Sequence, residues 1–112
     1  MIKPKIIGIL NLTQDSFSDG GKYIDITNAI DYVKKMINAG VDIIDIGAES
    51  TKPGFKSISP DQQLEKILPV LNEIKNNCKP VSISIDTRSS LVAKEALNAG
   101  AVIINDVSSG TY

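Results

Sequence analysis

The sequence predicts an α/β fold, the first half of a (βα)8 barrel with elements in the order βαβαβαβ. Two observations predict it. Four short apolar runs, each followed by an acid or a carboxamide, alternate with helix-like segments, and one eight-residue segment recurs 60 residues later, an offset of two βα units. Short runs rich in Ile and Val are typical of buried parallel strands. Because such strands all point the same way, their polar ends should gather on one rim, where βα proteins bind ligands.

The predicted strands are the four runs themselves. Each contains four or five residues before its polar end, which is a usual strand length. They cover residues 6–10, ending at Asn11; residues 41–44, ending at Asp45; residues 81–85, ending at Asp86; and residues 101–104, ending at Asn105.

The segments between the runs predict helices. Apolar side chains recur at helical spacing over residues 29–37, and Gly40 supplies a stop. Ser59 and Gln62 form a capping-box pattern around the start of a second helix. A third helix is expected over residues 89–99.

An internal repeat favours a barrel over a doubly wound sheet. Residues 38–45 recur as residues 98–105, with Ile-Ile-Asp matched by Ile-Ile-Asn. A tight αβ turn alone would select the Ala-Gly pair, but it does not explain the matching strand ends. A complete barrel takes about 250 residues, and this chain has 112. Its first and fourth strands would therefore be open edges, closed either in a homodimer or by a missing C-terminal half.

Composition excludes several classes of function. The net charge of −1 and the absence of Trp indicate no general affinity for nucleic acid or anionic membranes. No stretch approaches the roughly 20 apolar residues of a membrane span. The apolar run after Lys5 is too short for a signal peptide, and Cys78 is the only cysteine, so we expect a cytoplasmic protein without disulfides.

The first predicted loop, residues 8–21, is long and polar and ends in two glycines. Such a loop is typical of a mobile lid, and we expect mobility between about Thr13 and Tyr23. The alternative is an ordinary surface turn in which Asp15, Ser16 and Ser18 bond to local backbone.

Four segments together resemble the dihydropteroate synthase family, and the resemblance covers the whole chain. They are residues 8–21, 45–54, 84–87 and 103–107. Two positions depart from the family pattern. Gln14 stands where Pro is usual, and Lys52 stands where Arg is usual. Lys52 keeps the charge but loses the planar fork of a guanidinium group.

The resemblance implies a reaction and its substrates. Such enzymes join 4-aminobenzoate to 6-hydroxymethyl-7,8-dihydropterin diphosphate and release pyrophosphate in folate biosynthesis. Asp86 matches the family residue that accepts a pterin ring N–H and the exocyclic amine, and Asn105 matches a residue that binds the same ring. On the residues alone, both could instead cap the ends of their strands.

The resemblance also implies a magnesium ion and two loop contributions. Asn11 matches the family's Mg²⁺ ligand, and its carboxamide oxygen is a hard ligand that suits that ion. Asp19 is implied to approach the metal or the developing pterin cation, and Phe17 to pack on the aminobenzoate. Substrate contacts from the second loop are implied for Thr51, Lys52 and Pro53.

The family's later signatures supply a Lys, an Arg and a His that this chain does not contain at matching positions. We therefore expect the 112-residue chain alone to lack synthase turnover. Two other interpretations stay open. One is a non-catalytic pterin-binding module, and the other is a methyltetrahydrofolate-binding methyltransferase domain, since Asp86 and Asn105 suit either pterin.

Overall fold

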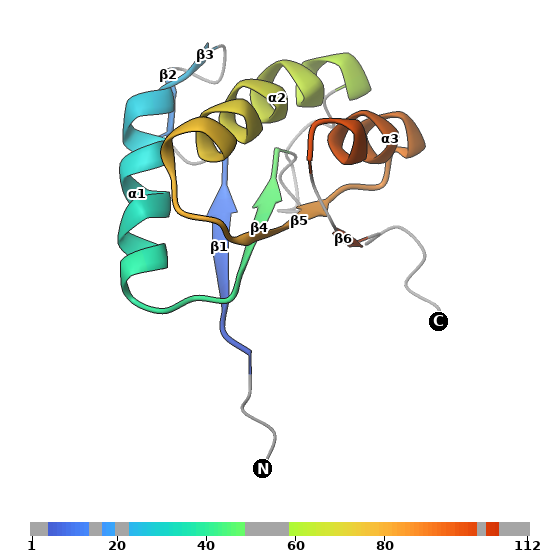
Figure 1. Ribbon diagram of the computed structural model, residues 1–112. Helices are drawn as coiled ribbons and strands as arrows, with labels where there is room; N and C mark the ends of the chain where they lie inside the picture. Colours follow the sequence, from blue (N-terminus) through green and yellow to red (C-terminus); the bar gives the residue numbers. More distant parts are fainter. Residues whose placement is uncertain (1–4, 14–16, 20–22, 49–58, 101–102, 106–112) are drawn as a thin grey trace.

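A computed structural model describes residues 5–13, 17–19, 23–48, 59–100 and 103–105 of the chain (Figure 1). Its main feature is a four-stranded parallel sheet in the order β1-β4-β5-β6. The strands are β1 (Ile7–Asn11), β4 (Ile43–Gly47), β5 (Ser82–Asp86) and β6 (Ile103–Asn105), and the helices are α1 (Ile26–Asn38), α2 (Pro60–Asn77) and α3 (Ser90–Asn98).

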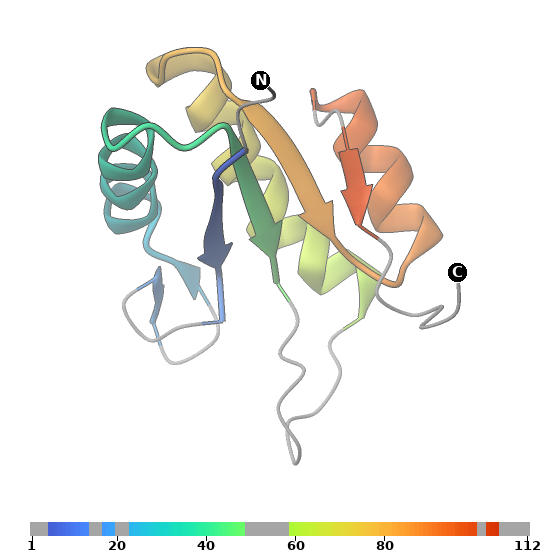
Figure 2. The same cartoon turned by 90° about the horizontal axis from the view of Figure 1, so that it is seen from below.

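All three helices lie on the same face of this sheet (Figure 2). Consecutive parallel strands joined by helices on one face are the layout of a (βα)8 barrel. The predicted first half of such a barrel is therefore confirmed. No helix in the described part of the chain is long and apolar enough to cross a membrane.

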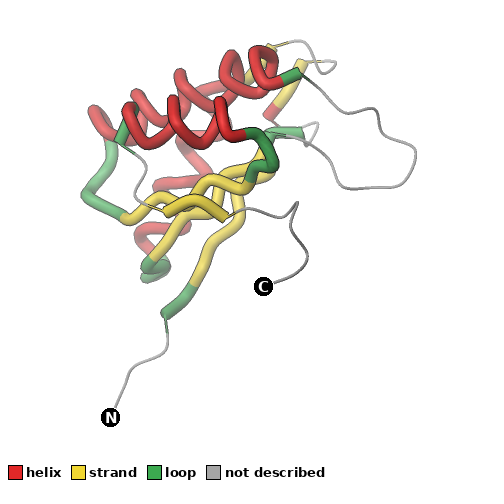
Figure 3. The backbone as a smooth tube through the Cα atoms, turned by 90° about the vertical axis from the view of Figure 1, so that its right-hand side faces the viewer, coloured by secondary structure: helices red, strands yellow, loops and turns green. Residues whose placement is uncertain are grey.

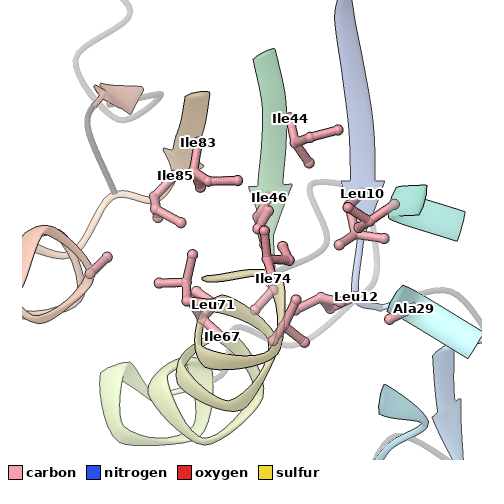
Figure 4. Packing of buried hydrophobic residues seen from close by; sticks show 14 of the residues in the cluster. Leu10, Leu12, Ala29, Ile44, Ile46, Ile67, Leu71, Ile74, Ile83 and Ile85 are labelled. Carbon is pink, nitrogen blue, oxygen red and sulfur yellow. The ribbon is translucent and has the colours of Figure 1, made fainter. Parts of the chain in front are cut away.

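The hydrophobic core fills the layer between the sheet and the helices. Every second residue of β1, β4 and β5 points into it, as the two-residue period of a strand requires. Figure 4 shows these strand side chains meeting the apolar stripe of α2. The labelled members include Leu10, Ile44, Ile46, Ile83 and Ile85 from the strands and Ile67, Leu71 and Ile74 from α2.

The helix ends follow the local sequence. The Ser59 hydroxyl accepts a hydrogen bond from the Gln62 backbone N–H at 3.1 Å, and the Gln62 side chain accepts one from the Ser59 N–H at 2.9 Å. The predicted capping box is thus confirmed. Gly40 and Gly100 follow α1 and α3 with φ of +98° and +111°, a conformation that L side chains rarely adopt. This explains why the repeat keeps glycine at both turns.

The predicted position of the second strand was wrong by two residues. The sequence suggested a strand over residues 41–44 that ends at Asp45, but β4 pairs from Ile43 to Gly47. The chain turns at Gly40, and the Asp42 carboxylate accepts the Ile6 backbone N–H at 2.7 Å before the ladder begins. Asp45 therefore lies in the middle of β4 and not at its end.

The first loop also contains structure that the sequence did not indicate. Two short strands, β2 (Ser18–Asp19) and β3 (Tyr23–Ile24), pair in antiparallel fashion. Figure 3 shows this hairpin beside the helix layer and beyond the carboxyl ends of the strands. Residues 14–16 and 20–22 of the loop lie outside the described residues, so the predicted mobility between Thr13 and Tyr23 stays a prediction.

Candidate functional site at the carboxyl rim

The strand register places the candidate polar residues in one row across the rim. Asn11 of β1 pairs with Gly47 of β4, Gly47 pairs with Asp86 of β5, and Asp86 pairs with Asn105 of β6. Three of the four polar strand ends are therefore neighbours or near neighbours on one edge, as the parallel arrangement predicts. The fourth, Asp45, lies one row deeper.

The deeper row consists of Ile9, Asp45, Ser84 and Ile103. Residues two apart on a strand share a face, so these two rows both belong to the face that the helices leave uncovered. The site is thus built on the inner face of the half barrel, with glycine in the rim position above Asp45.

The Asp86 carboxylate has an oxygen whose hydrogen-bonding capacity is unsatisfied within the described residues. Its Oδ1 atom is buried, and no donor in the described part of the chain reaches it. Removal from water raises the pKa of the Asp86 carboxyl, and the negative charge of Asp45 raises it further. A buried carboxylate oxygen without a partner is costly, and N–H groups of a ligand would offset that cost.

Asp45 and Ser84 form a direct link between neighbouring strands. The Ser84 hydroxyl donates to Asp45 Oδ1 at 2.6 Å across the β4–β5 ladder. Ser84 is a buried polar residue, and this bond satisfies its hydroxyl. The bond fixes the Asp45 carboxylate on the inner face.

A second polar link supports the connection that follows Asp86. The hydroxyl of Thr87 donates to the Gln63 side-chain carbonyl at 3.2 Å and accepts the Ser89 backbone N–H at 3.0 Å. Both Thr87 and Gln63 are buried. The first turn of α2 therefore holds the backbone that immediately follows the candidate pterin acceptor.

Asn11 is half-buried at the end of β1, where its side chain is already engaged. Its Oδ1 accepts the Thr13 backbone N–H at 3.0 Å and the Thr13 hydroxyl at 2.6 Å. This is the local turn that a strand-end Asn commonly makes. Within the described residues, no group of three or more His, Cys, Asp or Glu could hold a metal ion.

Phe17 is held by its own chain. Its side chain is 6% exposed, and its ring centroid lies 5.5 Å from that of Tyr32 on α1. Its backbone carbonyl accepts the N–H of Asp25, the N-cap residue of α1, at 2.9 Å. The described part of the first loop is therefore anchored by an aromatic contact and a backbone bond.

The remaining predicted site residues are placed only in part. The backbone of Asp19 lies in β2 and that of Asn105 in β6, while nothing of their side chains is described. The second-loop residues Thr51, Lys52 and Pro53 lie outside the described residues.

Three inner-face residues were missed as site residues: Asp45, Gly47 and Ser84. The signal was present in the sequence, since Ile44 and Ile46 alternate with Asp45 and Gly47 at the period of a strand with one apolar face. The predicted strand ended at Asp45, and this concealed the alternation.

Comparison with known proteins identifies the family of this chain. The family model described as pterin binding enzyme matches residues 7–112. The chain is 48% identical over 102 residues to dihydropteroate synthase of Clostridium beijerinckii, covering 91% of this chain and 38% of that protein. It is 49% identical over 112 residues to dihydropteroate synthase of Staphylococcus haemolyticus, covering all of this chain and 41% of that protein.

Solved structures give the same result. Dihydropteroate synthase of Xanthomonas albilineans with 4-aminobenzoic acid matches with a TM-score of 0.83 and 36% identity, over 95% of this chain and 39% of that one. The Burkholderia cenocepacia synthase complexed with 7,8-dihydropteroate matches with a TM-score of 0.76 and 34% identity, over 94% of this chain and 33% of that one.

The chain therefore belongs to the family of pterin binding enzymes. It spans about two fifths of the length of the synthases to which it is similar. The resemblance inferred from the four sequence segments is confirmed at the level of the family.

Proposed function

We propose that residues 1–112 form the N-terminal half of a dihydropteroate synthase barrel, which condenses 4-aminobenzoate with 6-hydroxymethyl-7,8-dihydropterin diphosphate. The observation that carries this proposal is the unpartnered, buried Oδ1 of Asp86 in a row with Asn11 and Asn105 at the carboxyl rim. The similarity to dihydropteroate synthases supports the choice of reaction.

In this function Asp86 binds the pterin. The pterin edge presents a ring N–H beside an exocyclic amine, and one carboxylate accepts both. The Asn105 carboxamide offers a donor and an acceptor to the same ring. Loss of diphosphate leaves positive charge on the pterin, and the Asp86 carboxylate stabilises that charge as it develops.

The first loop contributes two residues to the proposed site. Asp19 approaches the positive charge that develops on the pterin, and Phe17 packs on the aminobenzoate. Because Phe17 is buried against Tyr32, this role requires its ring to leave or share that contact when the loop closes. Thr51, Lys52 and Pro53 complete the aminobenzoate side.

Asn11 is the residue that would hold Mg²⁺. Its carboxamide oxygen fits, because this ion prefers hard oxygen ligands and keeps several waters of its own. The ion would neutralise the charge of the diphosphate leaving group. The Thr13 hydroxyl bonds to the same oxygen and must turn away to free a lone pair. A cytoplasmic location stays a prediction from the sequence.

The test uses the complete chain encoded by the natural gene. Replacing Asp86→Asn should weaken pterin binding by about 1.5–3 kcal/mol, because a charged acceptor is lost. Calorimetry with the pterin measures this, and pteroate formation is compared with methyl transfer from methyltetrahydrofolate in the unsubstituted protein.

Asp31→Asn, an exposed change of the same charge on α1, is the matched control and should bind pterin normally. Unchanged pterin affinity in the Asp86 variant, or methyl transfer without pteroate formation, would contradict the proposal.

A further inference from the structure

The Asp45 carboxylate lies directly under the candidate pterin site and is fixed there. It faces the inside of the half barrel, one row below the rim, and takes a short hydrogen bond from Ser84. A bond of 2.6 Å from a hydroxyl to a carboxylate oxygen belongs to the strong, charge-assisted class. The core of this chain has no need for an acid here, because the opposite faces of β4 and β5 supply its packing.

Asp45 is also the charged neighbour of Asp86. Ser84 lies two residues before Asp86 on β5, and Gly47 lies two residues after Asp45 on β4, so the two acids flank one step of the ladder. A Cβ added at Gly47 would lie 3.6 Å from Asp86 Oδ2. Glycine therefore leaves the side of the Asp86 carboxylate open at the rim.

The described surroundings of Asp86 contain no compensating cation whose charge acts on it. Among the described residues, the charge that acts on its carboxyl is that of Asp45, and it is repulsive. Residues 103–105 of β6 carry no titratable side chain, and the helices pack on the other face of the sheet.

We propose that Asp45, tethered by Ser84, is a positioning residue that holds the Asp86 carboxylate toward the rim and strengthens its demand for N–H donors. The inference rests on the proposed function. Two like charges on one face repel, and Ser84 prevents Asp45 from turning away. Asp86 therefore points its oxygens to the ligand, and a pterin that brings N–H groups and positive charge relieves the repulsion.

The test measures pterin binding against pH in the complete synthase chain. Asp45→Asn should weaken pterin binding at neutral pH by roughly fivefold, since neighbouring groups in one network couple by about that much. The acid limit of binding is the pH below which pterin binding is lost. Asp45→Asn should move this limit to lower pH, because removing the Asp45 charge lowers the pKa of Asp86. A merely structural role would not move that limit.

Substitutions at Ser84 test the proposal independently, because they leave the negative charge of Asp45 in place. Ser84→Ala removes the tether and should weaken binding by a smaller factor, while Ser84→Thr keeps a hydroxyl and should restore it. This pair carries the test if the Asp45 variant does not fold. Asp31→Asn controls for the loss of one charge.

The outcomes separate the two proposals. If Asp86→Asn weakens pterin binding as expected but Asp45→Asn changes neither affinity nor acid limit, the positioning role is overturned and the function stands. Equal binding by the Ser84→Ala and Ser84→Thr variants also counts against the tether. If Asp86→Asn binds pterin normally, the proposed function itself fails.

Discussion

The two faces of one sheet differ sharply in this molecule. On the helix-facing side, Leu10, Ile44 and Ile46 are fully buried. On the inner side of the same strands, Ile7 and Ile9 are 58% and 65% exposed. Alternate residues of one strand thus have opposite environments, because successive side chains point to opposite faces. The outer face therefore packs the core of this chain, while the apolar side chains of β1 on the inner face stay exposed.

The largest difference in stability is expected between two isoleucine-to-alanine substitutions, one on each face of the sheet. Ile46→Ala should lower the free energy of unfolding of this chain by about 2–5 kcal/mol, since it leaves a cavity in a packed core. Ile9→Ala should cost no more than about 0.5 kcal/mol, because an exposed side chain leaves no cavity. Urea denaturation followed by circular dichroism measures both. Equal losses in the two variants would show that the inner face is also packed in the isolated chain.

Substitutions at two glycines, one on each face, test the same difference between the faces. A Cβ at Gly8 would lie 2.5 Å from Met36 Sδ and 3.3 Å from Val41 Cγ1, so Gly8→Ala should destabilise the chain by about 1–3 kcal/mol. A Cβ at Gly47 would meet Asp86 only at ordinary contact distances, so Gly47→Ala should leave stability nearly unchanged.

The Gly47 variant should instead affect the ligand. Its added methyl group narrows the space beside Asp86, and pterin binding by the complete synthase chain should weaken. Thermal unfolding and pterin calorimetry together give both readouts. A stable Gly8 variant would mean that Met36 moves aside without cost.

The exposed isoleucines also predict association. The isolated 112-residue chain should self-associate through its inner face and the edge strand β1. Ile9→Lys should weaken that association by about tenfold, equivalent to about 1.4 kcal/mol, because it places a charge on the apolar patch. Sedimentation velocity over a range of concentrations measures it. A strictly monomeric unsubstituted chain would contradict the prediction.

The smallest expected effect is the contribution of the Asp86 carboxyl to the pH dependence of stability. Burial and the Asp45 charge raise the pKa of Asp86 in the folded chain above its ordinary value of 3.8. The stability linked to its protonated form is fully present below that value and is lost as the pH rises through the folded pKa. Asp86→Asn should therefore raise the urea midpoint slightly at pH 7 and leave it unchanged near about pH 3. A lower midpoint at pH 7 would contradict this.

The sequence by itself determined the elements and their order. Helix starts and stops depend on neighbours within one turn, such as Ser59 with Gln62, or Gly40 after α1, and these were correctly predicted. The ends of β1, β5 and β6 were also correct, since a polar residue at the end of an apolar run is a local signal. The gathering of Asn11, Asp86 and Asn105 at one rim followed from the parallel strand directions.

Only the tertiary structure decided how deep each residue lies and what it touches. Asp45 belongs one row below Asp86 because β4 pairs with β5 in a particular register, and register depends on backbone bonds between segments about forty residues apart. The same holds for Phe17, which is buried because α1 folds back to bring Tyr32 beside it. Contacts between distant segments are set by packing of the whole layer, and a local pattern in the sequence does not contain them.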